Sequence, residues 1–144
     1  MPISARKMSI LQTYTPQQMV ELTGVSVHTL RYYEKIGLLD PVDRAESGHR
    51  RYTEADLTRM NFLKRLRATG MPISQMQHYV ALFRDGDDTM RERREMLEAH
   101  RQEVLAQIDA LQDTLDLLDG KIERYQQAER ADSINQCTIE REGT

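Results

Sequence analysis

A run of apolar residues in the last third of the chain recurs with the spacing of a coiled coil. Between Val104 and Tyr125 the apolar positions step by 4, 3, 4, 3, 4 and 3 residues. This heptad pattern is typical of a helix that packs lengthwise against another helix. The predicted dimerisation seam consists of Val104, Ile108, Leu111, Leu115, Leu118, Ile122 and Tyr125.

The seam predicts a long rod that needs a partner. Residues 89–127 in one helix would extend about 58 Å at roughly 1.5 Å per residue. A lone helix of that length would leave its apolar stripe in water, and a second copy of the chain is the simplest partner. The alternative is a helix folded back on its own domain, but the preceding helices are too short to cover the stripe. Gly120 lies inside the rod and costs about 1 kcal/mol relative to alanine.

Composition limits what the rest of the chain can build. Of 144 residues, 6% are aromatic and 30% are charged, and there is no Trp, so a mainly helical, elongated architecture is favoured over a thick multilayer core. The sequence contains neither a membrane-length apolar run nor a signal-peptide stretch, which predicts a cytoplasmic protein without a membrane partner. The single cysteine, Cys137, excludes an intrachain disulfide and a zinc site built from several thiolates.

Charge is distributed unevenly along the chain. Residues 1–84 carry 12 Lys or Arg against 7 Asp or Glu, whereas residues 85–144 carry 8 against 16. The front part is therefore basic and the back part acidic, which indicates that the front part meets a polyanion. Uneven solvated faces are the alternative explanation.

Two short helices separated by a glycine turn are predicted near the N-terminus. Thr15 as N-cap, Pro16 at the first helical position and Gln18 three residues after the cap form a capping box. Gly24 ends this helix, and Ser26 caps a second one that runs to about residue 36. This is the helix-turn-helix layout.

The second helix has two distinct faces. Val27, Leu30 and Tyr33 recur at three-residue spacing and suit a core. The other face is polar, cationic and aromatic, as expected of a nucleic-acid-reading surface, although a solvated face would also carry Lys and Arg. It consists of His28, Arg31, Tyr32 and Lys35.

A basic hairpin and two further helices follow. The Ser47-Gly48 turn is flanked by Arg44 on one side and by His49, Arg50 and Arg51 on the other, which predicts a short hairpin with a cationic tip. Thr53 and Asp56 form a second capping box. The apolar positions of the third helix are Leu57, Met60, Leu63 and Leu66, and those of the fourth are Ile73, Met76, Val80 and Phe83.

The strings TPQQMVELTGVSVHTLRYYEKIGLL and GHRRYTEADLTRMNFLKRLRATGMPISQM, followed by a long heptad helix, resemble the MerR family of bacterial transcriptional regulators. The resemblance covers about residues 14–127. It implies a mainly α fold: a winged helix-turn-helix with a small β-hairpin wing, followed by a long antiparallel coiled-coil dimerisation helix. We therefore predict a DNA-binding domain at residues 14–86, with the helix-turn-helix at about 17–36, and a dimerisation helix at 87–127. A flexible arm is predicted at 1–13, and a flexible tail at 128–144, where periodicity is weak.

The resemblance places DNA contacts on particular residues. The DNA-reading helix corresponds to residues 26–36, the wing arginines to Arg50 and Arg51 with Tyr52 packing beneath, and a further cationic contact to the next helix. His28 and Arg31 are the candidates for reading base edges, whereas Tyr33 suits either DNA contact or the core. The predicted DNA-binding residues are His28, Arg31, Tyr32, Tyr33, Lys35, Arg50, Arg51, Tyr52, Lys64 and Arg65.

The chain departs from its relatives at two places. Pro72 stands where many relatives have a serine N-cap, and the first thiol position of metal-responsive relatives falls near Met90. One thiol per chain argues against a metal sensor. Cys137 is either a reactive sensor thiol or a bystander in the tail.

These observations predict a homodimeric regulator that is not an enzyme and uses no cofactor. It would bind an inverted repeat in double-stranded promoter DNA, distort it, and act on RNA polymerase in response to a small effector or stress signal. The alternative is a helical adaptor that uses its heptad helix to bind another protein without recognising DNA. The sequence shows no phosphate-binding glycine loop, metal-ligand cluster or nucleophile paired with a base that would favour catalysis.

Overall fold

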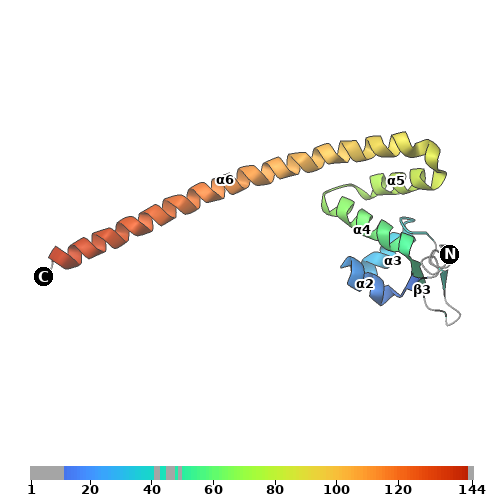
Figure 1. Ribbon diagram of the computed structural model, residues 1–144, viewed down its shortest axis with the longest axis horizontal. Coiled ribbons are helices and arrows are strands. Elements are labelled where there is room, and N and C mark those ends of the chain that lie inside the picture. The colour runs from blue at the N-terminus through green and yellow to red at the C-terminus, as the bar shows by residue number, and fades with distance from the viewer. Residues whose placement is uncertain (1–11, 41–42, 45–47, 49, 143–144) are drawn as a thin grey trace, which may run out of the picture. The chain divides into compact units, whose positions relative to one another are not determined.

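The computed structural model describes residues 12–40, 43–44, 48 and 50–142 (Figure 1). The chain forms two compact units, Met1–Glu98 and Ala99–Thr144. The elements, in chain order, are β1 (Thr13–Tyr14), α2 (Pro16–Thr23), α3 (Val27–Lys35), β2 (Asp43–Arg44), β3 (Arg50–Thr53), α4 (Glu54–Ala68), α5 (Ile73–Asp85), the 3-10 turn η1 (Asp87–Thr89) and α6 (Met90–Glu142). The predicted mainly helical class, with a small antiparallel wing and a long last helix, is confirmed.

Both predicted capping boxes are present. The backbone amide of Gln18 donates to Thr15 Oγ1 at 3.2 Å, and the amide of Thr15 donates to Gln18 Oε1 at 2.9 Å. Thr53 and Asp56 make the equivalent pair at the start of α4. Gly24 ends α2 with φ 73°, a left-handed conformation that favours glycine. These local signals fix where α2 and α4 begin, and hence where the turn between α2 and α3 lies.

The sheet has three short strands in the order β1-β3-β2. Tyr14 of β1 pairs with Tyr52 of β3, and Arg44 of β2 pairs with Arg50 of β3, both antiparallel. The β2–β3 pair is the predicted hairpin. Of its connection the structure describes only Gly48, so His49 lies outside the described residues, as do the neighbouring positions 45–47.

One apolar core holds the first unit together. It draws on every helix from α2 to α5 and on β3, which fixes α3 against α4 and the wing. Its fully buried members include Met19, Leu30, Leu38, Tyr52, Met60, Leu63, Met71 and Met76. Two predicted core positions differ: Val27 is 37% exposed and Phe83 is 49% exposed, while the neighbouring Leu82 is buried. Leu82 is buried outside the core cluster to which Val80 belongs, since residues two apart on a helix point to different sides.

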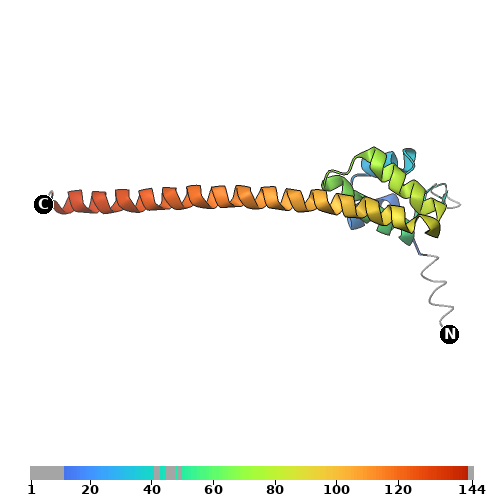
Figure 2. The ribbon, with the colours of Figure 1, turned by 90° about the horizontal axis from the view of Figure 1, so that it is seen from above.

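Helix α6 runs without interruption from Met90 to Glu142 (Figure 2). It therefore continues well beyond residue 127, where a flexible tail was predicted. No Gly or Pro follows Gly120 before residue 143, and Ala, Glu, Arg and Gln in this stretch favour helix. Thr13, which was assigned to the flexible arm, lies in β1 and pairs with Thr53 of β3. Residues 1–11 of that arm lie outside the described part.

Pro72 is the N-cap of α5 and makes no side-chain capping bond. This agrees with the departure noted in the sequence, because proline has no side-chain acceptor to offer. Among the described residues, none of the helices is both long and apolar enough to cross a membrane.

Candidate nucleic-acid interface

The exposed face of α3 carries the predicted polar, cationic and aromatic side chains. His28, Arg31 and Lys35 are exposed, and Tyr32 is 44% exposed. The opposite face is buried, with Leu30 at 0% and Tyr33 at 5% exposure. Burial of that face explains why the polar set points outward: the two faces lie on opposite sides of one short helix. The structure therefore brings these four side chains together on one surface.

Tyr33 belongs to the core of the single chain, and its predicted DNA contact stays a prediction. Its ring lies 6.2 Å from that of Tyr32, measured between centroids. Burial raises the pKa of its phenol above the ordinary value, although the charge of Arg67 acts in the opposite direction. The three-residue spacing from Leu30 predicted this core position.

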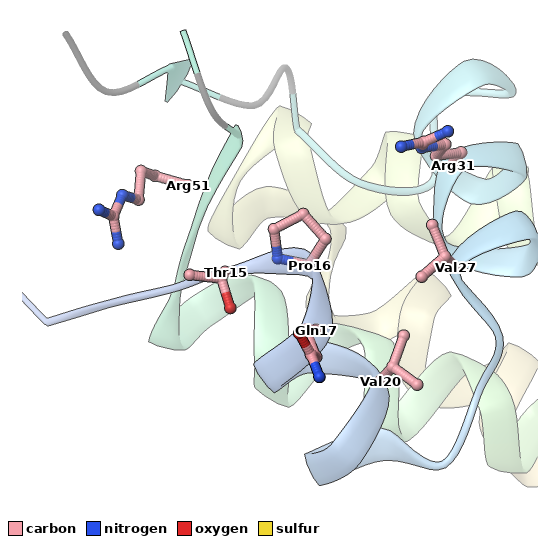
Figure 3. Close-up of a pocket in the computed structure, with 7 residues that line it drawn as sticks. All are labelled: Thr15, Pro16, Gln17, Val20, Val27, Arg31 and Arg51. Carbon is pink, nitrogen blue, oxygen red and sulfur yellow. The ribbon is translucent and has the colours of Figure 1, made fainter. Parts of the chain in front are cut away.

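A hollow of about 580 Å³ lies between the start of α2, α3 and β3 (Figure 3). Thr15, Pro16 and Gln17 form its floor at the N-terminus of α2, where the helix dipole is positive. Arg31 of α3 and Arg51 of β3 lie on opposite sides of Pro16 in Figure 3. A positive helix end between two guanidinium groups is suited to a phosphate group.

Sequence reasoning did not assign the start of α2 to the interface. The capping box marked a helix N-terminus, but it gave no sign of which segments would stand beside that end. The pairing of β1 with β3 brings Arg51 close to Thr15, and both line the hollow. The signal that could have found the site is the combination of an N-terminus with basic residues on both neighbouring elements.

The wing is tied to α3 by a hydrogen bond. The Tyr52 hydroxyl donates to Glu34 Oε2 at 2.8 Å, and Arg50 Nη1 lies 4.0 Å from the same oxygen. Tyr52 is 0% exposed, so the structure shows it as a packing residue, and a direct DNA contact by Tyr52 stays a prediction. The resemblance had placed it beneath the wing arginines, and this packing position is where it lies. Tyr52 holds β3, and with it Arg50 and Arg51, against α3.

This bond predicts a measurable effect of Tyr52→Phe. Losing the hydroxyl leaves the partly buried Glu34 carboxylate without this donor and should cost about 1 to 2 kcal/mol of unfolding free energy. Burial, the bond to Glu34 and its negative charge raise the pKa of Tyr52 above its ordinary 10.0, against the charges of Arg50 and Arg31.

The raised pKa gives this effect a pH dependence. Above about pH 10 an unfolded tyrosine releases its proton while the folded one keeps it. The stabilisation by Tyr52 is therefore complete below pH 10 and declines as the pH rises beyond it. Thermal melts of the parent and Tyr52→Phe should differ most near pH 7 and converge above pH 10. Tyr32→Phe, on the exposed face, is the control and should change neither the unfolding free energy nor its dependence on pH. An equal effect there would contradict the role given to the Tyr52–Glu34 hydrogen bond.

Lys64 and Arg65 lie on α4 with different surroundings. The Lys64 ammonium donates to the backbone carbonyl of Thr23, the last residue of α2, and its side chain is half-buried. Arg65 is exposed. Lys64 thus stabilises the turn between α2 and α3 through this hydrogen bond. Arg65, which is exposed, is the better placed of the two for a phosphate contact.

The seam predicted on α6 is exposed in the single chain. Val104 is half-buried, and Ile108, Leu111, Leu115, Leu118, Ile122 and Tyr125 are 51 to 66% exposed. Cys137 is a free, exposed thiol on the same helix. Within the described part of the chain, no group of three or more His, Cys, Asp or Glu side chains is arranged to hold a metal ion.

Comparisons with known proteins agree with this geometry. The family described as MerR HTH family regulatory protein matches residues 14–82, and the family described as MerR, DNA binding matches residues 57–130. An uncharacterised HTH-type transcriptional regulator of Haemophilus influenzae is 39% identical over 127 residues, covering 88% of this chain and 94% of the relative.

Two solved structures are similar over most of the chain. One is HiNmlR, a MerR family regulator lacking the sensor domain, bound to promoter DNA; its TM-score is 0.73 at 40% identity, covering 82% of this chain and 94% of that one. The other, a MerR family regulator from Listeria monocytogenes, has a TM-score of 0.79 at 37% identity and covers 89% of this chain and 98% of that one.

Proposed function

Because this chain belongs to the MerR family of transcriptional regulators, we propose that it works as a homodimer that binds an inverted repeat in a promoter. The observation that carries the proposal is the surface formed by α3, the start of α2 and the wing. There Arg31 and Arg51 flank a helix N-terminus. Phosphates bound at this end would set the register of the protein on the duplex. His28 and Arg31 on α3 would then reach base edges in the major groove.

The exposed seam supports the homodimer. A contiguous apolar stripe on a lone helix is unstable in water, and a second identical stripe matches it without any further partner. An antiparallel pairing of two α6 helices would relate the two winged units by a twofold axis. A twofold protein suits an inverted repeat, in which each half-site meets one α3.

The regulatory step follows the family's mode of action. We expect the dimer to bend and underwind the promoter, so that effector binding realigns the promoter elements for RNA polymerase, in the cytoplasm. The relatives are transcriptional regulators and not enzymes, and the adaptor alternative finds no support among them. A sensor role for Cys137 stays a prediction, tested by whether Cys137→Ser still responds to inducers.

Salt dependence of promoter binding tests the proposal. Arg31, Lys35 and Arg51 from each chain would give at least six phosphate contacts per dimer, with Arg50 and Arg65 as further candidates. Raising salt from 50 to 200 mM should then lower the affinity by about a thousandfold. Gel-shift titrations with the chain's own upstream region measure this. A scrambled duplex of equal length is the control and should bind more weakly at every salt concentration. The proposal fails if the pure protein forms no discrete complex at low salt.

A further inference from the structure

A second hollow, of about 340 Å³, lies between α4 and α5 and shares no residue with the one at the start of α2. Three aromatic rings line it: Phe62 from α4, and Tyr79 and Phe83 from α5. The rings of Phe62 and Tyr79 are 5.8 Å apart between centroids and tilted by 46°. Phe62 is 38% and Phe83 49% exposed. Large aromatic rings left partly in water around a concavity are typical of a ligand site.

The cations around this hollow indicate the charge of its ligand. The guanidinium carbons of Arg59 and Arg93 lie 5.0 and 5.2 Å from the centroid of the Phe83 ring. Both distances are within the range of cation–π contact. Arg59 also lines the hollow directly, beside the Thr58 side chain. Arg93 does not line the hollow and donates to Thr89 Oγ1 and the Gly86 carbonyl, so Arg59 is the cation that a ligand in the hollow would meet. Its positive charge favours an anionic ligand over a cationic one.

Arg59 is already paired with a carboxylate, so a ligand anion would have to compete for it. Its Nη1 atom is buried and, within the described part of the chain, makes no hydrogen bond of good geometry. Its partner is Asp40, whose Oδ1 atom lies 3.2 Å away as an ion pair. Arg84 binds the same Oδ1 atom at 3.0 Å. Since Asp40 would keep its ion pair with Arg84, a ligand carboxylate could bind Arg59 without leaving Asp40 unpaired.

We propose that the hollow between α4 and α5 binds a small aromatic carboxylate, which loosens the attachment of Asp40 and thereby weakens promoter binding. The volume is at the lower end of small-molecule sites and suits a ligand of one or two rings. The flat ring system stacks on the aromatic walls, and the carboxylate binds Arg59. The regulatory half of this inference rests on the proposed function, and the binding half does not.

Asp40 connects the hollow to the DNA-facing surface. It follows Leu38 and Leu39, two core residues that come directly after α3. Burial favours the neutral form of Asp40, but the guanidinium groups of Arg59 and Arg84 outweigh it and hold its pKa below the ordinary value. The carboxylate is thus ionised, and both guanidinium groups bind its Oδ1 atom. Competition for Arg59 removes the ion pair that joins Asp40 to α4, while the ion pair with Arg84 of α5 remains.

Titration of the full chain with 2-naphthoate tests the binding half. Calorimetry without DNA should show one saturable site per chain. Phe83→Ala removes a wall and Thr58→Phe fills the space; each should weaken binding at least about tenfold, the effect of losing one aromatic contact together with its buried area. Leu117→Ala, on exposed α6, is the control and should leave it unchanged. The neutral 2-naphthalenemethanol should bind more weakly than the carboxylate.

The same probe tests the regulatory half. Saturating 2-naphthoate should lower promoter affinity in gel shifts with the parent chain and have no effect on Thr58→Phe. Absence of saturable binding, or equal binding by Thr58→Phe, overturns the site. Binding without any change in promoter affinity overturns the regulation, and a parent chain that binds no promoter overturns the proposed function instead. If 2-naphthoate dissociates the dimer in sedimentation runs, the hollow belongs to the interface between copies and the inference is wrong.

Discussion

Replacing Arg31 by alanine is expected to weaken binding to the specific promoter sequence by about 5- to 150-fold, the effect of losing 1 to 3 kcal/mol of base discrimination. Arg31 is exposed on α3 and also lines the hollow at the start of α2. It is therefore placed for both a base edge and a phosphate. Binding to non-specific DNA should fall much less, because it loses only one phosphate contact of several.

Parallel gel shifts with promoter and scrambled duplexes measure the two losses. Arg94→Ala is the matched control, since Arg94 is an exposed arginine paired with Glu98 on α6. That variant should retain the parent's affinity for both duplexes. Equal losses on the two duplexes in Arg31→Ala would show that Arg31 contacts phosphate alone, and base reading would then fall to other residues of α3.

Replacing Leu115 by aspartate should separate the dimer into single chains. Leu115 is the middle residue of the seam and is 51% exposed in the single chain. In a paired seam both copies would bury a carboxylate in apolar surroundings, each at a cost of several kcal/mol. Promoter affinity should fall by more than about a hundredfold, because a single winged unit reaches only one half-site.

Leu117→Asp provides the control for this change. Leu117 is 74% exposed and lies off the seam, so the same substitution there should leave the dimer and its promoter affinity intact. Sedimentation velocity at several protein concentrations gives the assembly state of both variants. A dimer that survives Leu115→Asp, or one that both variants disrupt equally, would contradict the seam as the interface.

Local signals in the sequence predicted much of the fold because each depends on a few neighbouring residues. The capping boxes at Thr15 and Thr53 and the glycine at position 24 mark where helices begin and end, and the structure has them there. The three- to four-residue spacing of polar and apolar side chains on α3 predicted its exposed face in the same way. Such features require no knowledge of which distant segments meet.

The positions that the sequence did not predict depend on distant partners. The resemblance placed Tyr52 beneath the wing arginines, but its hydrogen bond to Glu34, which links β3 to α3, depends on a residue 18 positions away. The pair of Arg59 and Arg84 on Asp40 joins three separate segments, so no single stretch of sequence indicates it. The extension of α6 past residue 127 was missed for another reason: a helix needs no apolar period to persist where its residues favour it.

The exposed apolar seam on α6 also has a consequence for how much of the regulator a cell must make. When copies are scarce and mostly single, the concentration of pairs rises with the square of the number of chains. Doubling the amount of protein would then roughly quadruple the occupied fraction of a sparsely occupied promoter. Gene dosage would become an input to the circuit in its own right, alongside any chemical signal.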